Sequence, residues 1–279
     1  MIKSISYWSM KDGLAGTYPI ADALNTAKES GFQGLELCIG TDGVLSTSTS
    51  QADCQKYRAM IDKSGVKVQT LAAGLTWGVN PTSDDVATRR RSIDVHKAAL
   101  QRAAWLGCQT MLYVPGIVKS PITPDIIIRY DRAVERAREA VKELLDTAEK
   151  VNVELGIENV WNGLFYSPLE FRDFVDSFKS SKAVVYFDVG NGLGYHQHPP
   201  HRIELLGERI RRVHVKDYKN AIGSLNGFCD LLAGDVPWRE TMAALRGVGY
   251  TGTLTAEMIP WDPGVLQRTS VAMDQILAM

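Results

Sequence analysis

The stretch RVHVKDY, residues 212–218, reads as a short β-strand that carries both a histidine and a lysine. Side chains alternate between the two faces of a strand, so His214 and Lys216 point to the same face. Burying an imidazole and an ammonium group together is unfavourable unless each has polar or charged partners. This strand therefore predicts a polar site inside an otherwise apolar layer.

Runs of the same kind recur along the chain. Short stretches rich in β-branched and aromatic residues alternate with segments of helical periodicity. The eight predicted strands are ISYW (5–8), GLELC (34–38), VKVQTLA (66–72), TMLYVP (110–115), VELGIEN (153–159), VVYFDVGN (184–191), RVHVKDY (212–218) and TLTAEMI (253–259). Glycines such as Gly31, Gly65, Gly107 and Gly249 follow helical segments just before a strand, which is typical of the junctions in a repeating strand–helix unit.

Eight such units in 279 residues match the size of a (β/α)₈ TIM barrel, and we expect one barrel domain over residues 1–279. No Pro-, Gly- or Ser-rich linker divides the units. A doubly wound open sheet is the alternative, but YWSMKDGLAG (7–16), after the first strand, lacks the GxGxxG spacing of a dinucleotide-binding turn. In TIM barrels the chemistry lies at the C-terminal ends of the strands, so polar residues there are the functional candidates.

Composition narrows the class of partner. The 31 basic and 32 acidic residues give a formal net charge of -1, which argues against nucleic acid or an anionic membrane as the main partner. The four cysteines have no CxxC spacing, which argues against a structural zinc site and a disulfide framework. No run has the length of a membrane span, and the N-terminal segment has no apolar core of a signal peptide. We therefore expect a cytoplasmic protein.

Four polar side chains stand at the ends of four consecutive predicted strands. They are Glu158, Asp188, His214 and Glu257. Any one of them alone could cap a loop or pair with an arginine, but neighbouring strand ends lie side by side in a closed barrel, so the four converge. Three converging carboxylates cannot all stay ionised without a cation. Three oxygen donors and one imidazole suit Mn²⁺, Mg²⁺ or Co²⁺ better than a structural zinc ion, and Mn²⁺ is our first choice.

The motifs around these residues resemble a known family. They are IENVWN (157–162), FDVGN (187–191), HVKDY (214–218), GDVPW (234–238) and AEM (256–258). Together they resemble the sugar phosphate isomerase/epimerase family of xylose isomerase-like TIM barrels, which includes tagatose and psicose 3-epimerases, xylulose-5-phosphate 3-epimerases, inosose dehydratases and, more distantly, endonuclease IV. The resemblance covers essentially the whole chain. It implies that the four strand-end residues hold the metal and that the protein is a homo-oligomer, a dimer or a tetramer.

The resemblance also implies an activity, the C3 epimerisation of a ketose or ketose phosphate with Glu158 and Glu257 as acid and base. Proton removal beside a ketone creates an enediolate, whose charge a divalent cation stabilises. An aldose–ketose isomerase or an inosose-type dehydratase begins with the same step, so these alternatives stay open. A non-catalytic sugar-binding barrel, or a phosphodiesterase like endonuclease IV, is less favoured because the four-residue set is intact and the chain has only five histidines.

Six further residues are candidates for binding the sugar: Lys216, Asn191, Glu36, Trp8, Trp161 and His196. The Lys216 ammonium would donate to a substrate oxygen or pair with a carboxylate such as Asp217. Glu36 is either a substrate ligand or a partner of a metal ligand. The tryptophans could stack on a sugar ring or pack in the core.

The remaining candidates bear on the substrate. Asn191 stands where epimerases for free ketoses commonly place a histidine, which moves the prediction toward phosphorylated ketoses. His196 lies in YHQHPPHR (195–202), which predicts a surface turn. The loop 219–235, at a usual phosphate position of such barrels, offers Lys219 but no arginine.

Overall fold

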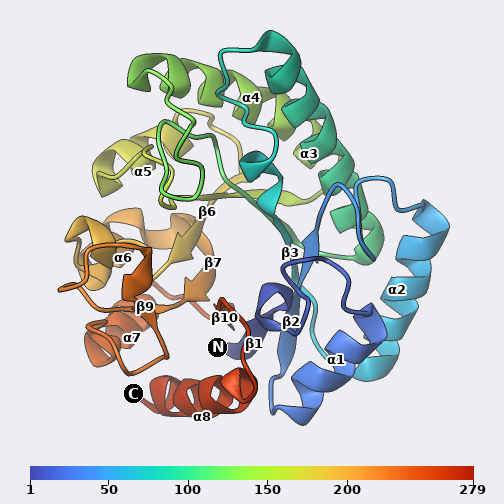
Figure 1. Ribbon diagram of the computed structural model, residues 1–279, viewed down its shortest axis with the longest axis vertical. Coiled ribbons are helices and arrows are strands. Elements are labelled where there is room, and N and C mark those ends of the chain that lie inside the picture. Colours follow the sequence, from blue (N-terminus) through green and yellow to red (C-terminus); the bar gives the residue numbers. More distant parts are fainter.

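The computed structural model describes residues 1–279 and contains a closed barrel of parallel strands (Figure 1). In order around the barrel, the strands are β1 (Ile2–Ser6), β2 (Gly34–Ile39), β3 (Thr70–Ala73), β4 (Thr110–Tyr113), β5 (Glu154–Glu158), β6 (Ala183–Asp188), β7 (Ile210–Val215) and β10 (Thr253–Ala256). The last of these pairs with β1 and closes the barrel. The predicted (β/α)₈ fold is confirmed.

Eight α-helices surround the barrel, as Figure 1 shows. They are α1 (Ile20–Glu29), α2 (Gln51–Ser64), α3 (Val86–Leu106), α4 (Tyr130–Val151), α5 (Pro168–Asp176), α6 (Pro199–Leu206), α7 (Trp238–Gly247) and α8 (Val265–Ala278). Local sequence sets their ends. Ser50 and Asp85 cap the N-termini of α2 and α3 with their side chains, and Gly65 and Gly107 end these helices in the left-handed conformation that glycine adopts without strain.

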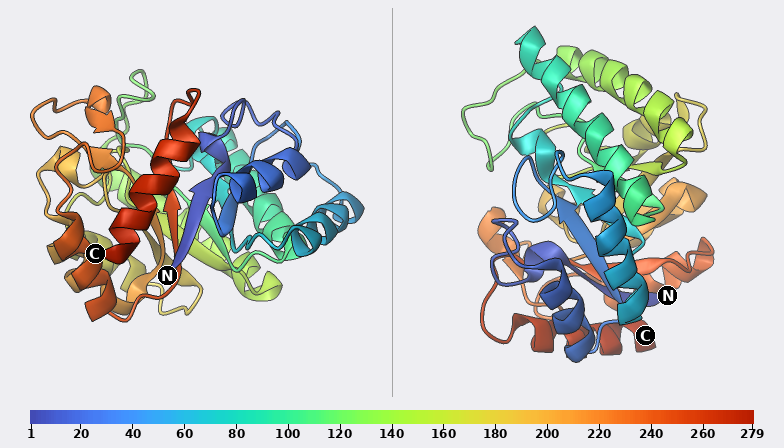
Figure 2. Two further views of the ribbon diagram at one scale, coloured as in Figure 1. Left: turned by 90° about the horizontal axis from the view of Figure 1, so that it is seen from below. Right: turned by 90° about the vertical axis from the view of Figure 1, so that its right-hand side faces the viewer.

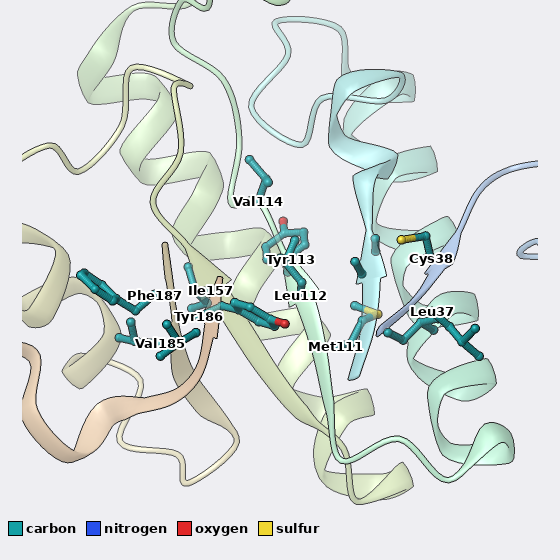
Figure 3. Packing of buried hydrophobic residues seen from close by; sticks show 14 of the residues in the cluster. Leu37, Cys38, Met111, Leu112, Tyr113, Val114, Ile157, Val185, Tyr186 and Phe187 are labelled. Carbon is teal, nitrogen blue, oxygen red and sulfur yellow. The ribbon is translucent and has the colours of Figure 1, made fainter. Parts of the chain in front are cut away.

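Side chains alternate between the barrel interior and the layer under the helices. On β6 the Tyr186 ring points across the interior, and the next side chain, Phe187, points the opposite way (Figure 3). A side chain at Gly156 on β5 would come within 3.0 Å of the Tyr186 ring, so glycine gives that ring its room. The interior therefore carries polar groups on a frame whose outer face is apolar.

The bounds of all eight predicted strands differ from those in the structure, most clearly at the first, third and seventh. β7 ends at Val215, and Asp217–Tyr218 form a separate strand, β8, which pairs antiparallel with β9 (Phe228–Cys229). The chain turns there because the buried Asp217 carboxylate binds the backbone of the following loop. Tyr7–Ser9 form a 3₁₀ turn after β1, and only the end of the stretch 66–72 is in β3. In the predicted surface turn at 195–202, the first four residues precede α6 and the rest belong to that helix.

The long loops gather at one end of the barrel, and the N-terminus lies toward the other (Figure 2, left). The β8–β9 hairpin belongs to the loop that follows β7. None of the helices combines the length and apolar character that crossing a bilayer demands. The C-terminal ends of the strands therefore face the end of the molecule with the most irregular structure.

Candidate metal centre and active site

The structure brings the four strand-end residues Glu158, Asp188, His214 and Glu257 together. Each offers one ligand atom, and these atoms lie within 4.8 Å of one another. Glu158, Asp188 and His214 are buried, and Glu257 keeps 10% of its side chain exposed; the two glutamates reach the wall of a cavity. The convergence predicted from the order of the strands is thus present.

Strand register explains the convergence. Asp188 on β6 pairs directly with His214 on β7, so their side chains start as neighbours. Glu158, the last residue of β5, pairs with Tyr186 on β6, which precedes Asp188 by two residues. Glu257 follows the last residue of β10, and its amide donates to the carbonyl of Val215, which continues the pairing with β7. Four adjacent strands therefore each contribute one ligand from the same end of the barrel.

The two ring nitrogens of His214 face different groups. Nε2 lies 2.7 Å from Oε1 of Glu36, which comes from β2 on the far side of the interior. The hydroxyl of Tyr186 donates to the other oxygen of Glu36. Nδ1 lies 2.9 Å from Oε2 of Glu257 and 3.9 Å from Oε1 of Glu158. Glu36 and Tyr186 thus fix the ring so that Nδ1 faces the carboxylates.

Two buried atoms indicate that the cluster fits a cation. Oδ2 of Asp188 and Nδ1 of His214 are inaccessible to solvent and make no hydrogen bond of good geometry, although Lys216 and Glu257 lie 3.1 and 2.9 Å from them. Buried polar atoms without a well-formed hydrogen bond are uncommon in folded proteins and often mark a place where an ion is bound. Both belong to the candidate ligand set, and three carboxylate oxygens with an imidazole nitrogen form a hard, mixed set of donors. The residues present therefore fit a divalent metal ion.

Lys216 lies directly after β7 and partly balances the carboxylates. Its Nζ is 3.1 Å from Oδ2 of Asp188 and 3.0 Å from Oε2 of Glu257. The ion pair with Asp217 that we considered is absent, because the Asp217 carboxylate accepts from three backbone amides and from the indole of Trp238. Lys216 lines the cavity together with Glu158 and Glu257, so its ammonium lies beside the candidate ligands at the cavity wall.

The two glutamates have opposite pKa shifts. Burial raises the pKa of Glu158 to about 8, and the nearby Lys216 and His214 only partly oppose this. Burial also acts on Glu257, but Lys216 and His214 outweigh it and lower its pKa to about 2. For His214, burial opposes protonation, yet Glu36 and Glu257 raise its pKa well above the usual value. Near pH 7, without metal, one glutamate holds a proton and the other does not.

Asn191 and Trp161 connect the ligands to the cavity wall. The amide nitrogen of the Asn191 side chain donates to Oε1 of Glu158 over 3.3 Å, and its backbone amide donates to Oδ1 of Asp188 over 2.8 Å. The indole of Trp161 donates to the carbonyl of Asn191 over 3.0 Å. Both residues line the cavity. Asn191 of the DVGN motif thus hydrogen-bonds two candidate ligands, Glu158 and Asp188, and also lines the cavity beside them.

A cavity of about 860 Å³ opens above the cluster. It is bounded by loops that follow the barrel strands, and one wall is apolar, with Trp8, Trp77, Leu112, Val114 and Ile122 among its residues. Ligand sites of this size with a few convergent polar groups are typical of small-molecule pockets. The arrangement can hold a small polar molecule with one end at the carboxylates.

Two of the six candidate substrate contacts do not line the cavity. Glu36 has no exposed surface and contacts His214, which agrees with the second role considered for it, a partner of a candidate metal ligand. His196 is exposed and also lies outside the cavity wall, because it takes the left-handed conformation that ends the short turn before α6. Trp8, Trp161, Asn191 and Lys216 do line the cavity.

Sequence reasoning missed two residues of the site. Tyr186 precedes Asp188 by two positions on one strand, so the period of two could have placed both in the interior. Phe228 lines the cavity and has the Lys216 ammonium 5.6 Å from its ring centre, but it comes from the β8–β9 hairpin, which no sequence signal indicated.

A closed parallel barrel with carboxylates and an imidazole at four strand ends is a TIM barrel with a candidate metal centre. A family model described as "Xylose isomerase-like TIM barrel" matches residues 24–273. The chain belongs to this family, as its motifs predicted.

Named relatives and solved structures are consistent with that membership. A D-psicose 3-epimerase of Enterocloster bolteae is 26% identical over 94% of this chain and 82% of its own length. An L-ribulose-5-phosphate 3-epimerase, UlaE, of Salmonella heidelberg is 24% identical over 84% of this chain and 80% of its own. The structure of D-psicose 3-epimerase from Clostridium cellulolyticum H10, with D-tagatose, superposes with a TM-score of 0.80 at 18% identity, covering 100% and 99% of the two chains.

Proposed function

We propose that the protein is an isomerase that epimerises a ketose at C3 and depends on a divalent metal ion, with Mn²⁺ as the first choice. The observation that carries this is the presence of Glu158 and Glu257 in one cavity wall, on either side of Asp188 and His214 in the order of the strands. The relatives named as 3-epimerases support the same class of reaction.

The two glutamates supply the proton chemistry. The carboxylate of one takes the proton from C3, and the electron pair of the broken C–H bond moves into the C2–C3 bond as the C2 carbonyl gains negative charge. The other glutamate delivers its proton to the opposite face of C3. The surroundings of the two glutamates differ even without metal: burial raises the pKa of Glu158, whereas at Glu257 the nearby Lys216 and His214 outweigh burial and lower the pKa.

The remaining residues bind and orient. Glu158, Asp188, His214 and Glu257 would hold the metal ion, which when bound would stabilise the negative charge that develops on the substrate oxygens. The Lys216 ammonium can donate to one of those oxygens, since it lines the cavity beside the cluster. Trp8 and Trp161 present aromatic surface to the C–H faces of a sugar and reduce the access of water.

An endonuclease IV-like reaction lacks support in the arrangement of the histidines. Only His214 belongs to the candidate metal cluster, His96 is a buried residue of α3, and the other three lie at or near α6. A cluster of several metal ions bound by histidines has no residues here to hold it.

Product analysis tests the proposal. The protein is stripped with EDTA, reloaded with Mn²⁺, Mg²⁺ or Co²⁺, and incubated with ketopentoses, ketohexoses and their phosphate esters. We expect the C3 epimer of one ketose to appear, only with metal. Formation of an aldose would instead indicate an aldose–ketose isomerase, and a deoxy product a dehydratase. Epimerisation that persists unchanged after complete removal of the metal would contradict the proposal.

A further inference from the structure

From the charges that surround the cavity, we infer that the substrate is an uncharged ketose and that Asp230 and Asp262 exclude phosphate esters. The inference rests on the proposed function and adds the chemical class of the substrate. It runs against the expectation of a phosphorylated ketose that Asn191 suggested.

The cavity wall carries more acidic than basic residues. Of its 24 residues only Lys216 is basic, whereas five carry carboxylates: Glu158, Asp217, Asp230, Glu257 and Asp262. Glu158 and Glu257 are candidate metal ligands and Asp217 is buried and hydrogen-bonded, so Asp230 and Asp262 are the carboxylates left to face a substrate. The charge of this single ammonium is offset by Asp188 and Glu257, whose oxygens lie within 3.1 Å of it. A phosphate monoester brings a charge of about -1.5 to -2 at pH 7 and needs cationic or amide donors to replace its water. The wall offers it carboxylates.

The position at which TIM barrels usually bind phosphate is filled by an ion-paired cluster. That position lies between the loops after the last two strands and a nearby helix N-terminus. Here Asp230 follows the β8–β9 hairpin, Asp262 follows β10, and Arg268 on α8 bridges the two, with Nε 3.0 Å from Asp230 and Nη2 2.8 Å from Asp262. Both aspartates line the cavity, and Arg268 does not. The guanidinium is therefore neutralised and set behind the carboxylates.

No other cationic side chain is placed to bind a phosphate at this position. Lys219 is exposed on the loop after β8 and is not part of the wall. Arg202 on α6 is fully buried behind β6, with its guanidinium 5.2 Å from the ring centre of Phe187, which faces away from the barrel interior (Figure 3). The amide of Val265, at the start of α8, already donates to the carbonyl of Asp262.

The rest of the wall suits an uncharged sugar. Trp8, Trp77, Leu112, Val114 and Ile122 provide apolar surface. Such surface favours the C–H faces of a sugar and leaves a phosphate without hydrogen-bond donors. Charge and apolar surface thus point to the same class of substrate.

The experiment compares a ketose that the enzyme epimerises with its own phosphate ester. We expect kcat/KM for the free ketose to exceed that for the ester by at least about 100-fold, because like charges placed together are strongly unfavourable. In the double variant Asp230→Asn/Asp262→Asn, Arg268 is released and the ratio of ester to free ketose should rise by at least about tenfold. Asp176→Asn, which removes an aspartate paired with Arg209 away from the cavity, should leave the ratio unchanged.

Two results would overturn the inference: equal or better turnover of the ester by the wild-type protein, or no rise of the ratio in the double variant. Calorimetric binding of the same two compounds to the Mn²⁺-loaded protein gives a readout that does not need catalysis. Tighter binding of the ester would also overturn it. Absence of turnover with both compounds, together with preferential binding of the free ketose, would contradict the proposed function and leave this inference supported.

Discussion

The two ring nitrogens of His214 have different roles in the proposed metal centre. Nδ1 would bind the metal ion, and the contact made by Nε2 positions the ring. Nδ1 faces the three carboxylates of the cluster, and Nε2 faces Glu36, which is itself held by the Tyr186 hydroxyl. Histidines that bind metals commonly donate their other N–H to a carboxylate, which fixes the ring and its tautomer. A chain of three interior residues from β2, β6 and β7 therefore sets the direction of one ligand atom.

Replacing Glu36 should weaken metal binding without touching the ligands. We expect Glu36→Gln to raise the Kd for Mn²⁺ about 10- to 100-fold, because the amide supports the imidazole less well than the carboxylate does. Tyr186→Phe, which removes only the donor to Glu36, should have a smaller effect. Metal titration by calorimetry measures both. An unchanged Kd in Glu36→Gln would show that this contact does not position His214.

Glu158→Gln tests the proposed catalytic role of Glu158. The amide cannot exchange a proton with carbon, so we expect turnover to fall by at least about 100-fold. The matched control is Glu154→Gln on the same strand, whose side chain contacts Thr110 and Arg211 at the other end of the barrel. The control should keep its activity. Full activity of Glu158→Gln would show that this residue takes no part in the reaction. If activity is lost but the variant still binds the sugar, the loss lies in catalysis and not in binding.

At the scale of the elements, the sequence predicted most of what the barrel requires. The eight strands and the glycines that end helices could be predicted, because the alternation of side chains in a strand and the left-handed residue after a helix depend only on local sequence. The ends of the strands could be predicted less well. Nothing in RVHVKDY shows that the strand stops at Val215, since the stop depends on the Asp217 carboxylate binding Leu232, Val236 and Trp238, which follow 15 to 21 residues later. Likewise, the role of Glu36 depends on a partner across the barrel.

Asp217 should be essential for the loop after β7. Its buried carboxylate accepts four hydrogen bonds. An asparagine there would place its NH₂ group against N–H groups that need an acceptor. We expect Asp217→Asn to lower the free energy of unfolding by about 3 kcal/mol. Asp235→Asn in the same loop removes an exposed contact with the amide of Asn220 and should cost less than about 1 kcal/mol. Urea unfolding compares the two, and equal losses would contradict this role of Asp217.

His96 on α3 should make the protein sensitive to acid. Burial lowers its pKa to about 4, from 6.5 in the unfolded chain, and its Nδ1 lies 2.7 Å from the carbonyl of Ser92. Between pH 6.5 and 4, His96 is therefore protonated in the unfolded chain but neutral in the folded protein. The stability that the neutral, buried His96 allows is present in full above pH 6.5 and is lost as the pH falls toward 4. Over that window it amounts to about 3 kcal/mol.

The measurement is urea unfolding at several pH values. His96→Gln should lose stability less steeply between pH 6.5 and 4, and the exposed His201→Gln should follow the wild type. Parallel curves for the wild type and His96→Gln would contradict the shift.

At the scale of the whole molecule, a nearly neutral chain carries two differently charged ends. The net charge is only -1. Carboxylates gather at the C-terminal ends of the strands, whereas Arg58, Lys182, Arg211 and Arg212 line a depression at the N-terminal ends. An acidic cavity attracts cations and disfavours anions. This separation of charge, which the total composition conceals, supports the proposal that the C-terminal end binds a divalent cation and an uncharged sugar.

The most direct test of the account is the fate of the C3 proton. The Mn²⁺-loaded protein is incubated in D₂O with the ketose that it epimerises, and NMR follows each carbon-bound proton. The account predicts that deuterium enters at C3 as the epimer forms, that no other carbon exchanges, and that Glu158→Gln abolishes the exchange. Epimer formation with full retention of the original proton at C3, or exchange at C1 alone, would contradict it.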